Sequence, residues 1–231
     1  MLTPFRFDDH GHVKFDWLDT RHHFSFGDYY NEDRMGFGPL RVINDDIIKA
    51  GNGFGFHPHR DMEIITYVRT GTVIHQDSLG NEGRTSAGDV QVMSAGRGII
   101  HAEHADPDAD TTLFQIWIHP RERGITPRWD QKAFPKDPVS GDLKLLVSGR
   151  SEDAGSDALL IHSDAAIYGG HLLKGSELTH ALKGPAYVVM SDGEATVNGV
   201  ALRKGDGAEV TGEDLLTVKA DSDAELLVIE L

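Results

Sequence analysis

The sequence predicts an all-β protein of the sandwich or barrel class. Short segments of β-branched or alternating residues recur along the chain, and turns containing Gly, Asp and Asn separate them. These segments are MEIITYV (62–68), DVQVMSA (89–95), TLFQIWI (112–118), AYVVMS (186–191), EATVNGVALRKG (194–205) and AELLVIEL (224–231). Asn198-Gly199 indicates a hairpin, because both positions tolerate the positive φ of a type I′ turn. No segment shows a sustained helical period with caps, so we expect short strands throughout.

The order of strands and turns occurs twice along the chain. In the first half a strand enters a turn at Gly71, makes a polar hairpin and meets a second turn at Gly88-Asp89. In the second half the corresponding turns are at Gly193 and Gly205-Asp206. A Ser-, Gly- and Asp-rich stretch at 147–157 lies between them and predicts a surface loop. Two related β units in one chain are the simplest explanation of this pattern.

Composition excludes several classes of function. The 231 residues include 22 Lys and Arg against 37 Asp and Glu, a net charge of −15, which disfavours direct binding to nucleic acid or to an anionic membrane. With no cysteine, the chain cannot form disulfides, thiolate metal sites or a cysteine nucleophile. The N-terminal residues lack the apolar core of a secretory signal, and no long apolar run follows. We therefore expect a cytoplasmic protein without a membrane span.

Two histidines flank a proline in GNGFGFHPHRDME (51–63). On a strand, the side chains of His57 and His59 point to one face with Cα atoms roughly 6.5 Å apart, so both imidazoles can reach one ion. Pro58 cannot donate a hydrogen bond to a neighbouring strand, which favours an edge or a barrel mouth. For this pair alone, two polar residues on the wet face of a strand are the simpler explanation.

A second pair changes that interpretation. His101 and Glu103, in GRGIIHAEH (96–104), have the same spacing, so two strands offer three histidines and one carboxylate. Four such ligands leave one or two positions open on a six-coordinate metal, as a catalytic site requires. Nitrogen and oxygen ligands without sulfur suit Fe(II), Mn, Ni, Co or Cu, and Zn is not excluded. Gln115 shares a strand face with Leu113 and Trp117 and is a candidate polar group of the same pocket.

The remaining histidines have simpler interpretations. His10 and His12 are expected to be an exposed pair, and His22 and His23 precede an aromatic run that is expected to build core or pocket wall. No partner at ligand spacing accompanies the others, which are His75, His104, His119, His162 and His171.

These segments resemble a known family. Gly51 to Gly71 is similar to the first cupin motif, a Gly, five residues, His-x-His, a Glu and a closing Gly, and Gly88 to His101 is similar to the second. Over about residues 15–130 the chain more closely resembles the pirin family, in HHFSFGDYYN (22–31), FGPLRVINDD (37–46), GFHPHRDMEIITYV (55–68), GTVIHQDSLGN (71–81), GIIHAEH (98–104) and LFQIWIHP (113–120). The resemblance implies a bicupin, two double-stranded β-helix (jelly-roll) barrels packed together, with a metal only in the N-terminal one. We expect the domains to be 1–135 and 136–231.

The resemblance also assigns the carboxylate ligand. Glu63 stands where most cupins have theirs, but in pirin-like proteins the carboxylate two residues after the last histidine takes that role, which here is Glu103. The proline usual in the second motif is absent, and the turn before His101 is longer. We therefore expect a metal held by His57, His59, His101 and Glu103, with Glu63 as a supporting or strand residue.

The second unit can be compared with the first by counting from its turn glycines. Counting back from Gly193 places Thr179 and Ala181 at the positions of the first histidine pair, so His180 between them is expected to point to the opposite face. Counting on from Gly205 places Val218 and Ala220 at the positions of the second pair. We therefore expect no metal site in the C-terminal unit.

Resemblance to bacterial pirins implies quercetin 2,3-dioxygenase activity, in which a flavonol and O₂ give a ring-opened depside and carbon monoxide. The expected cofactor is one divalent transition metal, with Fe(II) the first candidate, and Glu103 is the expected acceptor of the substrate proton. The alternative is a non-enzymatic, metal-binding regulator, since nuclear pirins are partners of transcription factors; the acidic surface would suit a basic protein partner. Another metal-dependent cupin enzyme is a third option. Pirin-like proteins suggest a monomer.

Overall fold

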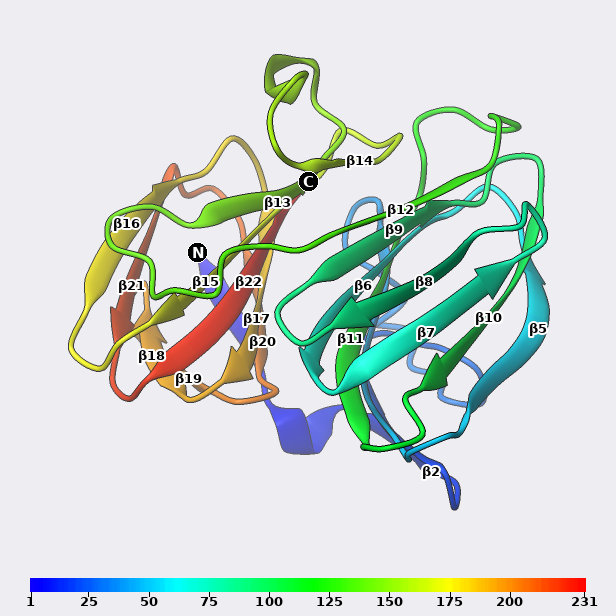
Figure 1. Cartoon of the computed structure of the whole chain (residues 1–231). Helices are drawn as coiled ribbons and strands as arrows, with labels where there is room; N and C mark the ends of the chain where they lie inside the picture. The colour runs from blue at the N-terminus through cyan, green and yellow to red at the C-terminus, as the bar shows by residue number, and fades with distance from the viewer. The chain divides into compact units, whose positions relative to one another are not determined.

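The computed structural model describes residues 1–231 and is built almost entirely of strands, numbered β1 to β22, with two short 3₁₀ turns at Phe7–Asp9 and Ser151–Asp153 (Figure 1). The chain forms two compact units. The N-terminal unit contains Gly11–Pro135 and Leu159–Asp164, and the C-terminal unit contains Met1–His10, Lys136–Ala158 and Ala165–Leu231. No helix has the length and apolar character needed to cross a membrane.

Two antiparallel sheets form the N-terminal unit. The larger has the strand order β12-β9-β6-β11-β4-β3-β2 and the smaller has the order β5-β10-β7-β8 (Figure 1). The strands are β2 (Gly11–Lys14), β3 (Leu18–His22), β4 (Leu40–Ile48), β5 (Gly53–His59), β6 (Glu63–Thr70), β7 (Thr72–Asp77), β8 (Glu82–Ser86), β9 (Val90–Ser94), β10 (Ile99–Ala105), β11 (Thr111–Ile118), β12 (Arg128–Lys132) and the two-residue β14 (Leu159–Leu160).

The side chains that point into the N-terminal unit are apolar at one end of its interior and polar further along. On β11, Leu113, Gln115 and Trp117 share one face, because successive side chains of a strand point to opposite sides. Leu113 packs in a buried apolar cluster with Val68 and Ile48, while Gln115 lies directly opposite Thr66 of β6. The sheet interior therefore changes from packed core to a polar region within one strand.

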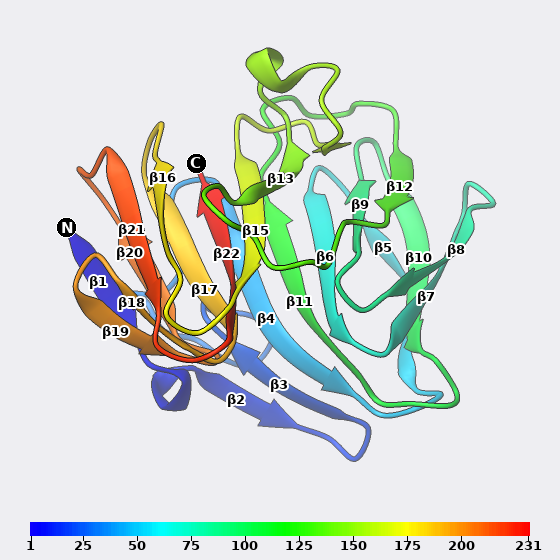
Figure 2. The same cartoon turned by 60° about the vertical axis from the view of Figure 1, so that its left-hand side comes forward.

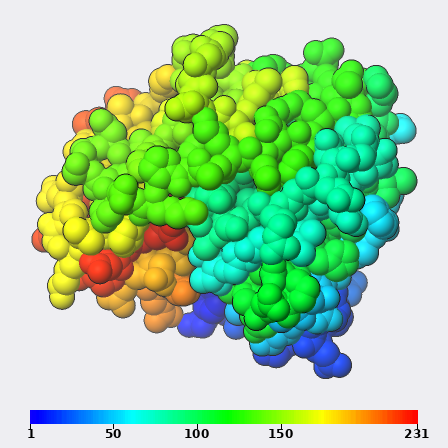
Figure 3. All heavy atoms as spheres, viewed as in Figure 1, coloured from blue at the N-terminus to red at the C-terminus, as the bar shows by residue number.

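The C-terminal unit repeats this plan with two further antiparallel sheets. Their strands pair in the orders β1-β20-β17-β22-β15-β13 and β16-β21-β18-β19 (Figure 2). The strands are β1 (Leu2–Phe5), β13 (Lys144–Ser148), β15 (Ala166–Leu172), β16 (Glu177–Ala181), β17 (Ala186–Asp192), β18 (Glu194–Val197), β19 (Val200–Arg203), β20 (Gly207–Val210), β21 (Leu215–Ala220) and β22 (Ala224–Glu230). Between its sheets lies an almost wholly apolar core that includes Leu178, Val188, Val218 and Val228. Figure 3 shows, in the view of Figure 1, that side chains fill the spaces that the ribbon leaves open.

The internal repeat predicted from the turns is confirmed. In the N-terminal unit β6 pairs with β9 and β7 with β8; in the C-terminal unit β17 pairs with β20 and β18 with β19. The matching glycines also share a conformation: φ is 75° at Gly71 and 69° at Gly193, and 79° at Gly88 and 80° at Gly205. The hairpin at Asn198-Gly199 has the positive φ values, 44° and 79°, of the expected turn.

The two compact units do not follow the single boundary expected after residue 135, because the N-terminal residues belong to the C-terminal unit. The first strand, β1, pairs with β20 in the register Leu2↔Val210, so the first ten residues belong to the C-terminal unit. Gly11, one residue later, already belongs to the N-terminal unit. The prediction of an exposed His10–His12 pair is wrong for His10, which is only 7% exposed. Pairing over some two hundred residues cannot be read from local pattern, which is why the sequence misplaces this strand.

Candidate metal centre

Three histidines converge inside the N-terminal unit. β5 and β10 pair antiparallel with His57 directly opposite His101, and the register slips beyond that point. The imidazole rings lie 4.5 Å apart between His57 and His101, 4.8 Å between His57 and His59, and 4.9 Å between His59 and His101. Nitrogen atoms of the three rings all lie within 4.8 Å of one another, a separation that one ion can bridge. The structure thus brings together the two histidine-bearing strands as the spacing predicts.

The electrostatics of the cluster favour the form of histidine that binds metals. Burial lowers the pKa of His101 to about 3, with His57 adding to the effect, and burial lowers the pKa of His59 to about 4. Both rings are therefore neutral at physiological pH and carry a free lone pair. His101 is 2% exposed, and neither of its ring nitrogens has a hydrogen-bond partner. A buried imidazole without any partner is costly, and a metal ion would satisfy it.

A hydrogen bond to the backbone fixes the orientation of the His57 ring. Its Nδ1 lies 2.7 Å from the carbonyl oxygen of Gly55, which can only accept, so Nδ1 carries the proton. The other ring nitrogen, Nε2, is therefore the atom available to a metal, and it points away from the backbone. Hydrogen bonding of the distal ring nitrogen to a carbonyl is the usual way in which proteins orient a histidine ligand.

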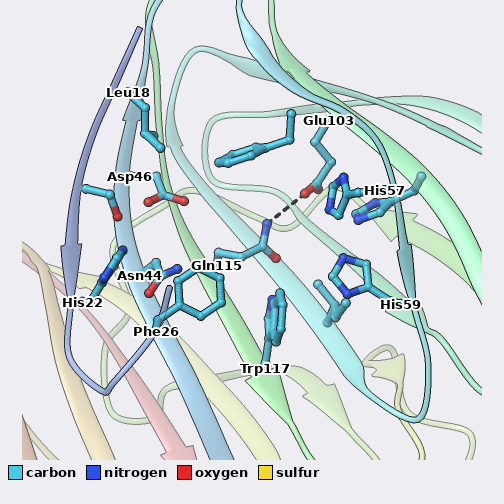
Figure 4. A pocket seen from close by; sticks show the side chains of 14 residues that line it. Leu18, His22, Phe26, Asn44, Asp46, His57, His59, Glu103, Gln115 and Trp117 are labelled. Carbon is cyan, nitrogen blue, oxygen red and sulfur yellow. Dashed lines mark hydrogen bonds between the residues drawn. The ribbon is translucent and has the colours of Figure 1, made fainter. Parts of the chain in front are cut away.

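Glu103 lies beside the cluster and is held by amide and hydroxyl donors. Its carboxylate accepts hydrogen bonds from Gln115 (2.9 Å), Thr66 (3.1 Å) and Gln91. Its oxygen lies within 4.8 Å of the ligand atoms of His101 and His75, which makes a second group sharing His101 with the first. The prediction that Gln115 is a polar group of the pocket is confirmed (Figure 4).

The cluster opens into a pocket with a volume of about 190 Å³. Aromatic rings form part of its wall: Trp117 lies edge-on to His59 at 4.9 Å and to Phe26 at 5.3 Å. The lining residues come from β3, β4, β5, β6, β10 and β11 and from the loop after β3, and they are Leu18, Thr20, His22, Phe26, Asn44, Asp46, Phe54, His57, His59, Ile64, His101, Glu103, Gln115 and Trp117.

Sequence reasoning missed the side of the pocket made by β3 and β4, which we call the polar wall: Thr20, His22, Asn44 and Asp46. These residues form two cross-strand pairs, Thr20↔Asp46 and His22↔Asn44, and each is less than 5% exposed. Burial raises the pKa of Asp46 to about 7, and burial lowers the pKa of His22 to about 4. Asn44-Asp45-Asp46 resembles a turn in the sequence, and only the pairing of β3 with β4 reveals a buried polar surface.

His75 was also missed, because Trp129 and His101, the rings that pack against it, come from other strands. It is fully buried on β7, its Nε2 lies 3.1 Å from Asp77, and its ring stacks on Trp129 at 4.8 Å. The ring of His101 on the neighbouring strand β10 is 5.4 Å away. His75 thus packs directly behind one of the three clustered histidines, a position that no local spacing indicates.

Glu63 forms its hydrogen bonds outside the histidine cluster. One oxygen of its fully buried carboxylate accepts hydrogen bonds from Ser94 (2.7 Å) and from the backbone amide of His162 (3.0 Å). Burial raises the pKa of Glu63 despite these donors. It is absent from the pocket lining and from both groups of metal-binding side chains. Its contacts join β6 and β9 to the segment 159–164.

In the C-terminal unit the expected orientation of His180 is wrong. β16 buries Leu178 and His180 and exposes Thr179 and Ala181, so His180 points inward. The count from Gly193 was one residue out of register for this strand. His180 Nε2 instead lies 2.8 Å from Glu230, whose other oxygen accepts a 2.8 Å hydrogen bond from Arg150.

The pairing registers now identify the counterparts of the N-terminal cluster. His57 lies opposite His101, and Leu178 lies opposite Val218; these pairs correspond through the turn glycines. Glu103 corresponds to Ala220 by the same register. Three of the four positions therefore hold apolar side chains that belong to the packed core of the unit.

Two cupin barrels in tandem, one with a histidine and glutamate cluster in a lined pocket, define a metal-binding protein of the bicupin class. The model of the family Pirin matches residues 6–118, and that of the quercetinase C-terminal cupin domain matches residues 145–231. The chain belongs to the pirin family.

Two relatives match over nearly their whole length. A pirin-like protein of Caulobacter vibrioides is 50% identical over 100% of this chain and 99% of its own. The quercetin 2,3-dioxygenase of Escherichia coli is 45% identical over 97% of this chain and 96% of its own. The crystal structure of the bacterial pirin YhhW from Escherichia coli in complex with nickel(II) has a TM-score of 0.92, 42% identity, and coverage of 100% of this chain and 99% of the other.

Proposed function

We propose that the protein is a metal-dependent dioxygenase that opens the central ring of quercetin-like flavonols with O₂ and releases carbon monoxide. The observation that supports this most is the cluster of His57, His59 and His101 at one side of an aromatic-lined pocket. Names of relatives support the same activity, since the protein of Escherichia coli that is 45% identical is a quercetin 2,3-dioxygenase.

We propose His57, His59, His101 and Glu103 as the metal ligands. The donor set fits a divalent first-row ion: the lowered pKa values of His59 and His101 keep these two rings neutral, and His101 lacks any other partner. Fe(II) is the first candidate, and the nickel(II) complex of YhhW supports nickel as well. When bound, the ion would supply a Lewis acid and a template for adjacent substrate oxygens.

The residues of the chain would perform the remaining tasks. Glu103 is the candidate acceptor of the flavonol hydroxyl proton, and Gln115, Gln91 and Thr66 orient its carboxylate. Trp117 lies beside His59, and Phe26 packs against Trp117; both would exclude water from the bound ring. The overall reaction balances as one flavonol and one O₂ giving one depside and one carbon monoxide.

The first experiment measures the metal and the activity together. Protein loaded separately with Fe, Mn, Co, Ni or Cu is incubated with quercetin in air, and loss of quercetin absorbance and release of carbon monoxide are followed. We expect stoichiometric release with at least one metal. If no metal supports turnover, the dioxygenase proposal is wrong, and a metal-dependent protein-interaction module becomes the better hypothesis.

Variants then test the assigned roles. His57→Ala should lose the bound metal in elemental analysis, whereas His119→Ala, an exposed histidine after β11, should keep it. Retention of metal by His57→Ala would contradict the ligand assignment. Glu103→Gln should slow turnover by about a hundredfold or more; a variant with metal and full turnover would show that Glu103 is not the base.

A further inference from the structure

The polar wall contains buried polar atoms that have no hydrogen-bond partner in the protein. Nδ1 of His22 and Oδ1 of Asn44 have no hydrogen-bond partner, although both side chains are 4% exposed. Asp46, on the same face of β4 two residues further, is 3% exposed. Buried polar atoms in folded proteins are almost always paired, and the exceptions need an explanation.

These groups face the pocket. Figure 4 shows His22, Asn44 and Asp46 at one side of the cavity and His57, His59 and Glu103 at the other, with Gln115 between them. Each member of the wall lines the same cavity as the histidines. The wall is rigid, because it is carried by two adjacent paired strands of the larger sheet.

Between the two polar sides the cavity is apolar and aromatic. Leu18 lies at one end, Phe26 and Trp117 lie at the other, and Phe54 also lines the cavity. Aromatic and aliphatic walls accept flat rings, while separated polar groups fix their orientation. A ligand that fits must therefore carry polar atoms at two ends of an apolar, flat body.

We infer that the polar wall is a recognition site for ring hydroxyl groups of a polyphenol whose other end binds at the histidine cluster. This inference rests on the proposed function, since it names the class of flavonol that the same pocket takes. Asn44 can donate and accept, the carboxyl group of Asp46 accepts a phenol hydroxyl, and Nδ1 of His22 offers a further polar contact. Flavonols without hydroxyl groups on their outer rings would leave this wall unpaired.

The test compares ligands that differ only in these hydroxyl groups. Kaempferol and 3-hydroxyflavone share the same 3-hydroxy-4-keto unit, but only kaempferol carries hydroxyls on the outer rings, and it lacks the adjacent pair that would make quercetin a second chelator. Binding to nickel-loaded protein is titrated without oxygen by quenching of tryptophan fluorescence, so no turnover is needed. We expect wild type to bind kaempferol about tenfold or more tightly than 3-hydroxyflavone, because unpaired buried polar groups strongly reject a ligand lacking the hydroxyl.

Substitutions locate the effect. Asn44→Leu and Asp46→Leu remove the polar atoms at similar volume and should reduce the preference for kaempferol to about twofold or less, mainly by weakening kaempferol. Asn44→Leu should unfold in urea at or above the wild-type midpoint, since it removes a buried oxygen that lacks a partner. Ile47→Asn is the matched control, because Ile47 follows Asp46 directly in the chain, lies on the opposite face of β4 and is 39% exposed. It should keep the full preference.

The outcomes separate the two proposals. The recognition site is supported if wild type prefers kaempferol to 3-hydroxyflavone and both leucine variants lose that preference. This holds whether or not flavonols are consumed in air. Equal binding of the two ligands by wild type, or an unchanged preference in both variants, overturns it and leaves the dioxygenase activity to its own assay. If wild type binds neither flavonol, both the recognition site and the flavonol substrate are wrong. Binding and preference without turnover of quercetin contradict only the dioxygenase.

Discussion

Asp46 gives the most quantitative prediction, because its buried carboxyl group is a cost to the fold at alkaline pH. Burial raises its pKa from 3.8 to about 7, so the folded state takes up a proton that the unfolded state has already lost between these values. A group with a raised folded pKa stabilises below its unfolded pKa and loses that contribution as pH rises through the folded pKa. Each tenfold change in proton affinity is about 1.4 kcal/mol, so the loss approaches about 4 kcal/mol above pH 7.

Replacement by Asn removes this dependence, because the amide stays neutral. The advantage of Asp46→Asn over wild type should grow by about 3 kcal/mol between pH 5 and pH 8.5. With a urea slope of about 2 to 3 kcal/mol per molar, the unfolding midpoint of the variant should move by about 1 M relative to wild type. Metal-free protein is used, so that metal binding does not add to stability.

Tryptophan fluorescence suits this measurement, since the three tryptophans, Trp17, Trp117 and Trp129, all belong to the N-terminal unit. Asp16→Asn, at an exposed carboxylate, is the control and should change stability by less than about 0.5 kcal/mol at either pH. An equal difference between Asp46→Asn and wild type at both pH values, or one that shrinks as pH rises, would refute the assigned ionisation of Asp46.

Three further predictions follow from contacts described above. Gln115→Leu removes a donor to Glu103 and should lower metal affinity or turnover about 10- to 100-fold in metal titrations, with the fold intact by circular dichroism. Gly71→Ala should destabilise the N-terminal unit by about 1 to 3 kcal/mol in urea, because φ is 75° and a Cβ would meet a backbone oxygen at 2.6 Å; unchanged stability would contradict the strain argument. Glu230→Leu removes the buried carboxylate that pairs with Arg150 and His180, and should cost about 3 to 5 kcal/mol in calorimetry while metal content stays the same.

Periodic and turn signals predicted the fold well, because each strand or turn depends on neighbouring residues. Asn198 and Gly199 needed positive φ for a two-residue turn, and they have it. The pairs at 57–59 and 101–103 each lie on one strand, so their spacing alone shows that both members can share a face. The assignment of all four as ligands stays a prediction for the experiments above.

What the sequence could not predict depends on pairing between strands. His75 packs against His101 only because β7 pairs with β10, and Asn44 and Asp46 gain a common face with β3 through the same kind of contact. Asp and Asn are also poor strand formers, so the run at 44–46 contradicts the local propensity of β4. Such a conflict between local preference and fold is typical of functional sites.

The pairing of β1 with β20 has a consequence for how the chain folds as it is made. Strand β1 pairs with residues 207–210, so the C-terminal unit cannot complete its sheet until Val210 has been synthesised. The N-terminal unit draws most of its strands from one continuous segment, Gly11–Pro135, and these are available far earlier. Synthesis from the N-terminus would thus let the histidine-bearing unit form first, while the strand that precedes it waits for its partner.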